Sequence, residues 1–86
     1  MSQVETKDTS VRSIIYRAAF VKGFNEVKTG KPFDYDYAPR DLNDLWAYER
    51  GRLFAFVFDG NLKSGNKVLM SAMTAFASAY FDKAVT

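Results

Sequence analysis

Small side chains recur at intervals of four residues in two separate segments, and this spacing constrains the fold more than any other feature of the sequence. The later segment carries Ala47, Gly51 and Ala55 at this spacing. The earlier segment carries Ala19 and Gly23. Residues four apart lie on one face of a helix, and small residues there let two helix backbones approach closely. We therefore expect an antiparallel pair of helices that cross at these positions, which offsets the cost of about 1 kcal/mol for glycine within a helix.

Apolar residues at helical spacing define where these two helices begin and end. The first run follows Ser10, a residue suited to capping a helix N-terminus. It ends at Gly30 and Pro32, a pair typical of helix C-termini. The second run follows Asp41, another capping residue. These signals predict one continuous helix from Ser10 to Gly30 and a second helix that begins at Asp41.

The second predicted helix has a mostly apolar stripe. We expect Trp46, the only tryptophan of the chain, to anchor the core from this stripe. We also expect Glu49, which lies on or near the stripe, to meet a cation of the first helix. The stripe consists of Leu42, Leu45, Trp46, Glu49, Leu53 and Phe56.

A third helical pattern follows a loop rich in turn residues, "DGNLKSGNK". It predicts a third helix that is capped by Ser64 or Asn66 and covers the first two. An alternative stays open, because the Asp-Gly step at 59 and 60 is a strong hairpin signal and "LFAFVF" before it could pair with the run that follows. The two neighbouring stripes of the third helix are Val68, Ala72, Ala75 and Ala79, and Leu69, Met73, Phe76 and Tyr80.

The length and composition indicate a single small domain. The chain has 86 residues, of which 48% are hydrophobic, enough for a core. We expect residues 1–9 to form a disordered polar tail and residues 10–86 to form one all-α domain of three helices. A core of this size has little stability to spare, so we also expect a homodimer through an exposed stripe of the third helix.

The residues that are missing exclude several classes of site. The chain has no cysteine and no histidine, which removes disulfides, thiolate metal sites and the most common general base. The N-terminal stretch "MSQVETKDTS" has no apolar run of a signal peptide, and "LFAFVF" is far shorter than a membrane span. We expect a cytoplasmic protein without metal, cofactor or membrane partner.

Motifs with catalytic associations are weak in this chain. Residues 64–67, "SGNK", match the S-x-x-K pattern of penicillin-binding enzymes, but the other elements of that site are missing. Asp34 with Asp36 lacks the ligand pattern of a calcium loop, and helix capping accounts for Asp41 with Asp44. We therefore expect a protein that is not an enzyme.

Charge is distributed in blocks, although the net charge is only +2. Two basic segments flank an acidic middle segment, and a glycine-containing loop near Lys63 and Lys67 has the composition of a phosphate site at a helix N-terminus. Solvated helix faces with internal ion pairs would account for such blocks, and the alternative is a surface that meets nucleic-acid phosphates. The candidate RNA-binding or phosphate-binding residues are Arg12, Arg17, Lys22, Lys28, Arg50, Arg52, Lys63 and Lys67.

Aromatic residues form the second group of candidates. The linker "GKPFDYDYAPRD" carries three of them, and we expect at least one to fold back as a lid on the helix pair. Aromatic residues beside charges are also typical of protein-binding hot spots. The candidate protein-binding residues are Phe33, Tyr35, Tyr37 and Tyr48.

The order of "AAFVKGF", "GKPFDYDY" and "WAYERGRLFA" resembles the ribosome modulation factor family over residues 18–56. Gly23 and Phe24 match its first element, residues 30–33 approximate its linker, and Trp46 with residues 51–52 matches its second helix. The resemblance implies two helices joined by a linker. It also implies binding to ribosomal RNA and proteins, because the family's characterised members form inactive ribosome dimers.

A second resemblance gives a competing hypothesis. Short chains of this style are also similar to small accessory proteins of phages, many of which bind one host protein and block it. The leading hypothesis is thus a non-catalytic protein that binds the ribosome or RNA through basic helix faces. The alternative is a protein that binds and inhibits or redirects a single host protein.

Overall fold

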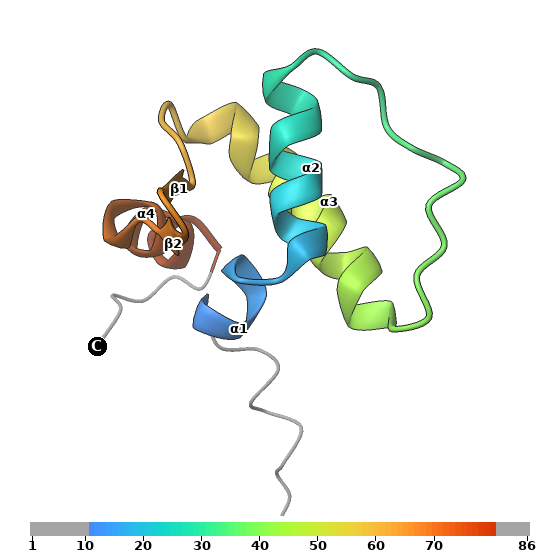
Figure 1. Cartoon of the computed structure of the whole chain (residues 1–86), viewed down its shortest axis with the longest axis horizontal. Coiled ribbons are helices and arrows are strands. Elements are labelled where there is room, and N and C mark those ends of the chain that lie inside the picture. The colour runs from blue at the N-terminus through green and yellow to red at the C-terminus, as the bar shows by residue number, and fades with distance from the viewer. Residues whose placement is uncertain (1–10, 81–86) are drawn as a thin grey trace, which may run out of the picture.

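The structure of the chain is a computed structural model that describes residues 11–80. These residues form a mostly helical domain with three substantial helices and a small β-hairpin (Figure 1), which confirms the predicted helical class. The predicted tail at 1–9 and the predicted cap Ser10 lie outside the described residues. The elements are α1 (Val11–Ile15), α2 (Ala18–Lys28), α3 (Leu42–Val57), β1 (Lys63–Ser64), β2 (Lys67–Val68) and α4 (Met70–Tyr80).

The first predicted helix is broken into α1 and α2, so the prediction of one continuous helix is wrong. The break lies at Arg17, whose backbone is extended, with φ −65° and ψ 139°. A straight helix would point Ile15 and Phe24 about 180° apart around its axis. Both side chains are buried, and the bend at Arg17 is what turns them towards the same core.

Helices α2 and α3 cross where glycine was predicted to allow it. A Cβ atom at Gly23 would overlap the carbonyl oxygen of Tyr48, and one at Gly51 would overlap the carbonyl oxygen of Phe20. Both obstacles are backbone atoms, so no side-chain rotation relieves them. The prediction that the two helices approach at their smallest residues is confirmed.

The direction of the pair corrects the predicted antiparallel arrangement. The guanidinium of Arg17 near the start of α2 lies 3.4 Å from the carboxylate of Asp41 at the start of α3. At the other end, Lys28 donates a hydrogen bond of 2.8 Å to the carbonyl oxygen of Phe58. The helices therefore run in the same sense, and residues 29–41 return beside them (Figure 1). At about 3.3 Å per extended residue, this linker easily spans the roughly 16 Å length of α2.

The buried face of α3 is not the predicted stripe. Its N-cap is as predicted, because the Asp41 side chain accepts a hydrogen bond from the backbone N–H of Asn43. The core side of the helix, however, carries the small residues and two aromatic rings. The buried residues of α3 are Ala47, Tyr48, Gly51, Phe54 and Ala55. Trp46 is partly buried and packs against the edge of the core, so it supports the core from outside and is not one of its fully buried residues.

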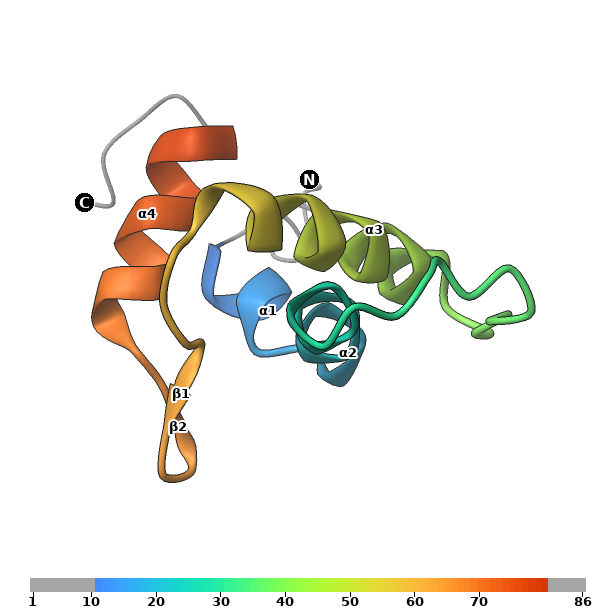
Figure 2. The same ribbon diagram turned by 90° about the horizontal axis from the view of Figure 1, so that it is seen from above.

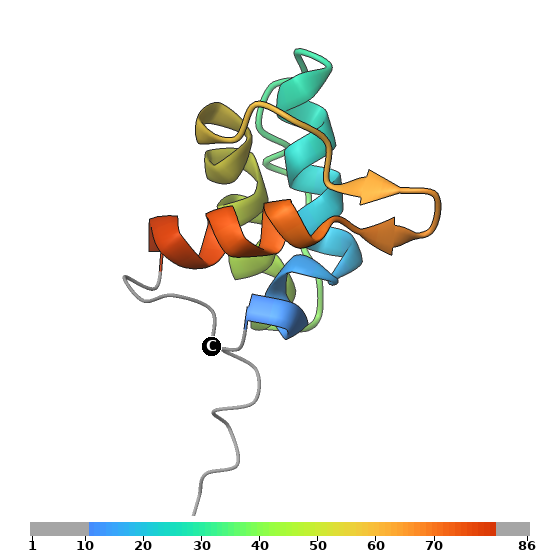
Figure 3. The same ribbon diagram turned by 90° about the vertical axis from the view of Figure 1, so that its left-hand side faces the viewer.

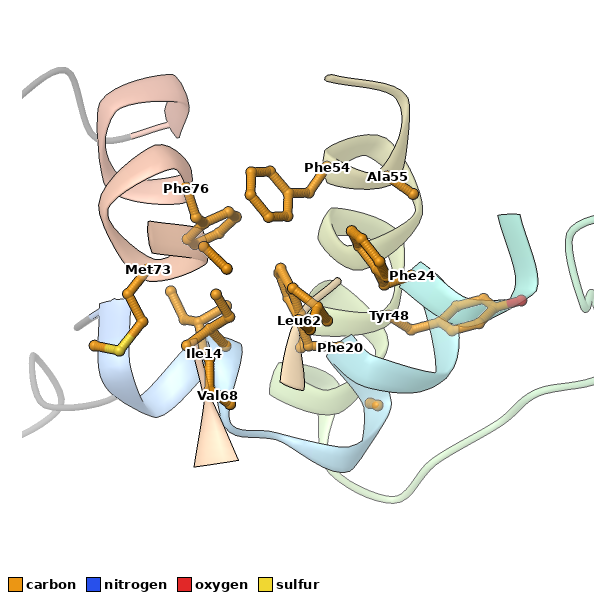
Figure 4. Close-up of a cluster of buried hydrophobic side chains, with 14 residues drawn as sticks. Ile14, Phe20, Phe24, Tyr48, Phe54, Ala55, Leu62, Val68, Met73 and Phe76 are labelled. Atoms are coloured by element: carbon orange, nitrogen blue, oxygen red, sulfur yellow. The ribbon is translucent and has the colours of Figure 1, made fainter. Parts of the chain in front are cut away.

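Aromatic rings fill the space between α2, α3 and α4. Figure 4 shows Phe54 and Phe76 pointing at each other from α3 and α4, with ring centroids 5.4 Å apart. Phe20 of α2 meets the edge of Phe76 at 5.0 Å. Edge-to-face pairs of this kind add about 0.5–1.5 kcal/mol each to the burial of the rings. The three helices are thus joined through Phe20, Phe54 and Phe76.

A short hairpin precedes α4 and stands out from the helices (Figure 3). Ser64 pairs with Lys67, so Gly65 and Asn66 form a two-residue turn, with Gly65 at φ +64°. The predicted capping of the third helix by Ser64 or Asn66 is therefore wrong. The alternative hairpin built on "LFAFVF" is also wrong, because residues 53–57 belong to α3.

Helix α4 itself largely follows its predicted pattern. Met73 and Phe76, from one of the two predicted stripes, are buried. Ala72, from the other stripe, is also buried. Apart from Met70 at its start, the exposed residues of α4 are small or polar, which leaves this helix with little apolar surface to offer.

Candidate functional site

The side of α3 turned away from α2 carries several large apolar residues in solvent. Leu42 is 77% exposed and Leu53 is 49% exposed. Phe56 and Val57, one turn further on, are 73% and 66% exposed. Figure 2 shows α2 end-on on one side of α3, and no described helix or strand lies on the opposite side of the middle of α3. The outer face of α3 is defined here as Leu42, Trp46, Glu49, Leu53, Phe56 and Val57.

An arginine borders this face. The guanidinium of Arg50 lies 5.0 Å from the ring centroid of Trp46 and 5.6 Å from that of Tyr80 in α4. Contacts of a guanidinium with two rings hold the side chain in place and leave its N–H groups free to donate at the edges. The outer face of α3 is therefore an apolar strip with a positioned cation beside its centre.

Such a face is typical of an interaction surface. Soluble proteins rarely expose contiguous apolar patches of this kind unless they dock a partner. A helix that is apolar on both sides also needs a second cover, because its inner side is already buried in the core. The predicted stripe of α3 was thus a real feature of the sequence, but it faces outward instead of inward.

Three of the cations predicted to bind RNA are engaged within the domain. Arg17 forms a salt bridge of 2.6 Å with Asp44, and this hydrogen bond raises the pKa of the guanidinium. Lys22 forms ion pairs with Glu26 and Asp34. Arg52 lies 3.1 Å from Glu26. These three side chains serve the packing of α2, α3 and the linker.

The remaining predicted cations do not gather on one surface. Arg12 lies on α1 beside the ring of Tyr16, whereas Lys28 lies at the far end of α2. Lys63 and Lys67 are exposed on the hairpin. Figure 1 shows that α1 and the end of α2 lie at opposite ends of the helix pair. The structure thus spreads the predicted phosphate-binding residues over several elements.

The four aromatic residues predicted to bind a protein partner differ in how exposed they are. Phe33 and Tyr37 pack against the core and against the ring of Tyr48, at 5.2 and 4.9 Å. The predicted lid is therefore confirmed for these two residues. Tyr48 is fully buried, so its ring is not an exposed anchor as predicted. Tyr35 alone of the four is exposed, at 88%.

Below this lid lies a polar network that holds the linker to the helix pair. The Tyr48 hydroxyl donates to Glu26 and accepts a 2.9 Å hydrogen bond from the backbone N–H of Asp34. Burial raises the pKa of the Tyr48 hydroxyl, which keeps it a donor. The hydrogen bonds from Lys22 and then from Tyr48 hold the pKa of Glu26 below its usual value.

Glu26 corrects the prediction made for Glu49. Glu26 of α2 pairs with Arg52 of α3 and with Lys22, and Glu49 takes no part in this network. Glu49 is exposed on the outer face of α3 and forms no ion pair with any residue between 11 and 80. Glu49 belongs to the predicted stripe, which faces solvent, and its side chain is therefore exposed.

We predict that Glu26 makes the domain sensitive to acid. The pKa of Glu26 is lower in the folded state, so its contribution is complete above its ordinary value of 4.5 and is lost as the pH falls below that value. The free energy of unfolding should therefore decrease below about pH 4.5, and Glu26→Gln should lower it by about 1–3 kcal/mol at neutral pH and flatten the decrease. Urea unfolding at several pH values measures both effects. Asp36→Asn, at an exposed linker position, is the control. Parallel curves for wild type and Glu26→Gln would contradict this role.

The linker also borders a shallow hollow of about 510 Å³. Lys22, Lys31 and the residues from Pro32 to Asp36 line it, together with Glu26. Its charged groups are largely paired with one another, as Lys22 is with Glu26 and Asp34. The hollow is thus a product of the linker's return path over the helix pair.

Residues 11–80 contain no group of three or more acidic, histidine or cysteine side chains placed to hold a metal ion. Within the same range, no helix has the length and apolar character needed to cross a membrane. Comparison with known proteins finds no matching family model, no matching curated protein and no matching solved structure. The function is therefore inferred from the geometry of the chain itself.

Proposed function

We propose that this protein is a non-catalytic binding module that docks an amphipathic helix on the outer face of α3. The observation that carries the proposal is the exposure of Leu42, Leu53, Phe56 and Val57 along one side of a helix whose other side is buried. A straight apolar strip along a helix fits a second helix, because side chains of one can lie between those of the other. The occupant therefore carries its own apolar strip and an acidic group that meets Arg50.

The proposal favours the protein-binding hypothesis over RNA binding. Binding to RNA phosphates needs cations that are free and close together. Arg17, Lys22 and Arg52 support the fold through internal ion pairs. Leu42, Leu53, Phe56 and Val57, by contrast, are exposed and lie outside the core cluster of the described residues.

Binding to ribosomal RNA, as in the ribosome modulation factor family, is the second candidate function. Its support is the exposure of four predicted cations, Arg12, Lys28, Lys63 and Lys67. If these four met phosphates, the logarithm of the affinity would fall with the logarithm of salt concentration with a slope of about four or less. Docking on an apolar face would show little salt dependence.

A capture experiment distinguishes the two functions. The tagged chain is incubated with nuclease-treated lysate of cells that also express the untagged chain, and captured proteins are quantified. We expect capture that survives nuclease and falls at least about tenfold with Leu53→Glu, since a charge there forbids apolar burial.

The matched control is Met70→Glu, which places the same charge on another exposed apolar residue at the start of α4. Capture by this variant should equal that of wild type. Capture that disappears with nuclease, or that is unaffected by Leu53→Glu, would overturn the proposal, and the first of these results would favour RNA.

A further inference from the structure

We propose that the helix docked on the outer face of α3 is α3 of a second copy of this chain, packed antiparallel in a symmetric homodimer. This inference rests on the proposed function, because it names the partner for the same surface. It follows from the spacing of the apolar residues, from the two charges at the centre of the face, and from the lack of a comparable face on α4.

The spacing of the outer face is that of a helix-to-helix seam. Leu42, Trp46, Glu49, Leu53 and Phe56 follow one another at intervals of four, three, four and three residues. This alternation places all five on one line along a helix that packs against another helix. Four of the five are apolar, and the exception lies at the middle of α3.

The central charges make this seam complementary to itself. Glu49 and Arg50 are neighbours in sequence, so they point about 100° apart and do not face each other within one helix. When two α3 helices pack antiparallel about a two-fold axis between these residues, Glu49 of each copy meets Arg50 of the other. Two ion pairs form at the centre, where an apolar partner would leave the charges without compensation.

The same register matches the apolar residues at both ends. Trp46 of one copy then lies opposite Leu53 of the other, and Leu42 lies opposite Val57. Leu42, Leu53 and Val57 thus gain apolar neighbours, whereas Phe56 lies opposite Asn43. Every contact occurs twice by symmetry. A parallel pair would instead place Glu49 against Glu49 and Arg50 against Arg50, so charge selects the antiparallel form.

Arg50 is positioned for this role before the second copy arrives. Its guanidinium is held between the rings of Trp46 and Tyr80, at 5.0 and 5.6 Å. Fixing a side chain in advance reduces the entropy lost on binding.

The predicted dimer through the third helix is replaced by this one. Helix α4 buries its apolar residues Ala72, Met73, Phe76 and Ala77 within the domain. Met70 is its one large apolar side chain exposed to solvent among the described residues, and Ser71, Thr74 and Ser78 offer little apolar area to a partner.

Molecular mass measures the dimer directly. Sedimentation equilibrium of the purified chain should show a mass rising with concentration from 9.8 kDa to twice that value. Leu53→Glu should raise the dissociation constant at least 30-fold, and Met70→Glu should leave it within twofold of wild type. Circular dichroism checks that each variant is folded. A wild-type chain that remains at the monomer mass at millimolar concentration would overturn the inference.

A charge exchange tests the register independently. Glu49→Arg alone should weaken the dimer at least tenfold. Residue 49 of each copy would then place a guanidinium against that of Arg50 in the other copy, and the two positive charges would repel. The double variant Glu49→Arg/Arg50→Glu should restore the dissociation constant to within about threefold of wild type. If Glu49→Arg has no effect, or if the double variant dimerises more weakly than Glu49→Arg, this register is wrong.

Cross-linking tests the direction, since the native chain has no cysteine. Glu49→Cys places two thiols close to the two-fold axis, and this variant should form a disulfide-linked dimer at concentrations where it associates. Leu42→Cys places them about 22 Å apart along the axis of an antiparallel pair, so it should not. Equal cross-linking of both variants would show a parallel pair and overturn the proposal.

These outcomes separate the dimer from the proposed function. A monomeric chain whose capture of another protein depends on Leu53 would show that the outer face of α3 docks a foreign helix. The inference would then fail and the function would stand. Capture of RNA alone by a monomeric chain would remove both.

Discussion

Gly51→Ala lowers the free energy of unfolding by at least about 3 kcal/mol, which for a domain of this size is a large part of the total. The added Cβ overlaps the carbonyl oxygen of Phe20, a backbone atom of α2. To relieve the overlap, α2 and α3 must separate, and the aromatic contacts that join them to α4 then loosen. Urea unfolding followed by far-ultraviolet circular dichroism measures the loss.

The sign of this effect is informative in itself. Alanine is favoured over glycine within a helix by about 1 kcal/mol, so without the crossing the substitution would stabilise the domain. Gly65→Ala is the control, because its Cβ would meet open space and only the backbone at φ +64° is strained. That control should cost about 1–2 kcal/mol. A Gly51→Ala variant as stable as wild type would contradict the crossing of α2 and α3.

Phe54→Ala is expected to lower the free energy of unfolding by about 3–5 kcal/mol, because it removes a buried ring from the junction of three helices. Phe54 stacks on Phe58 at 4.9 Å and also meets Phe20, Phe24 and Phe76 at 6.0, 5.9 and 5.4 Å. Thermal or urea unfolding measures the cost.

Phe56→Ala is a closely matched control on the same helix. Phe56 is exposed, so its removal should change the stability of the monomer by no more than about 0.5 kcal/mol. The comparison must be made at a concentration below that of dimer formation, since Phe56 belongs to the outer face of α3. Equal costs for the two variants would show that the inner and outer faces of α3 are wrongly assigned.

The parts of the fold that the sequence predicted are those controlled by local chemistry. Gly23 and Gly51 mark the crossing because no larger residue fits against a backbone carbonyl. Asp41 caps α3 through its own side chain, and Phe33 folds back because its ring is costly to leave in water. Each of these outcomes depends on a residue and its near surroundings.

The parts that could not be predicted depend on competition between distant segments. Both sides of α3 are apolar, so periodicity alone could not show which side α2 would cover. The small residues Ala47, Gly51 and Ala55 decide the matter, because they allow the closer approach. The stripe with Leu53 and Phe56 is left in solvent.

The candidate site was therefore visible in the sequence but assigned to the wrong role. A single chain gives no direct sign that an apolar stripe is exposed. The combination of a stripe of small residues with a second stripe of large ones on the opposite side is the signal that could have found it. The break at Arg17 had a similar sign, since Ile15 and Phe24 would point to opposite sides of one straight helix.

The parallel course of α2 and α3 also gives the domain an electrical direction. Peptide dipoles add along a helix, leaving partial positive charge at its N-terminus and partial negative charge at its C-terminus. In an antiparallel pair these ends would neutralise each other, but here like ends lie together. Asp41 and Asp44 lie at the shared positive end, and Lys28 reaches the carbonyl oxygen of Phe58 at the shared negative end. The acidic and basic residues at the two ends thus compensate the macrodipole that the return path of the linker creates.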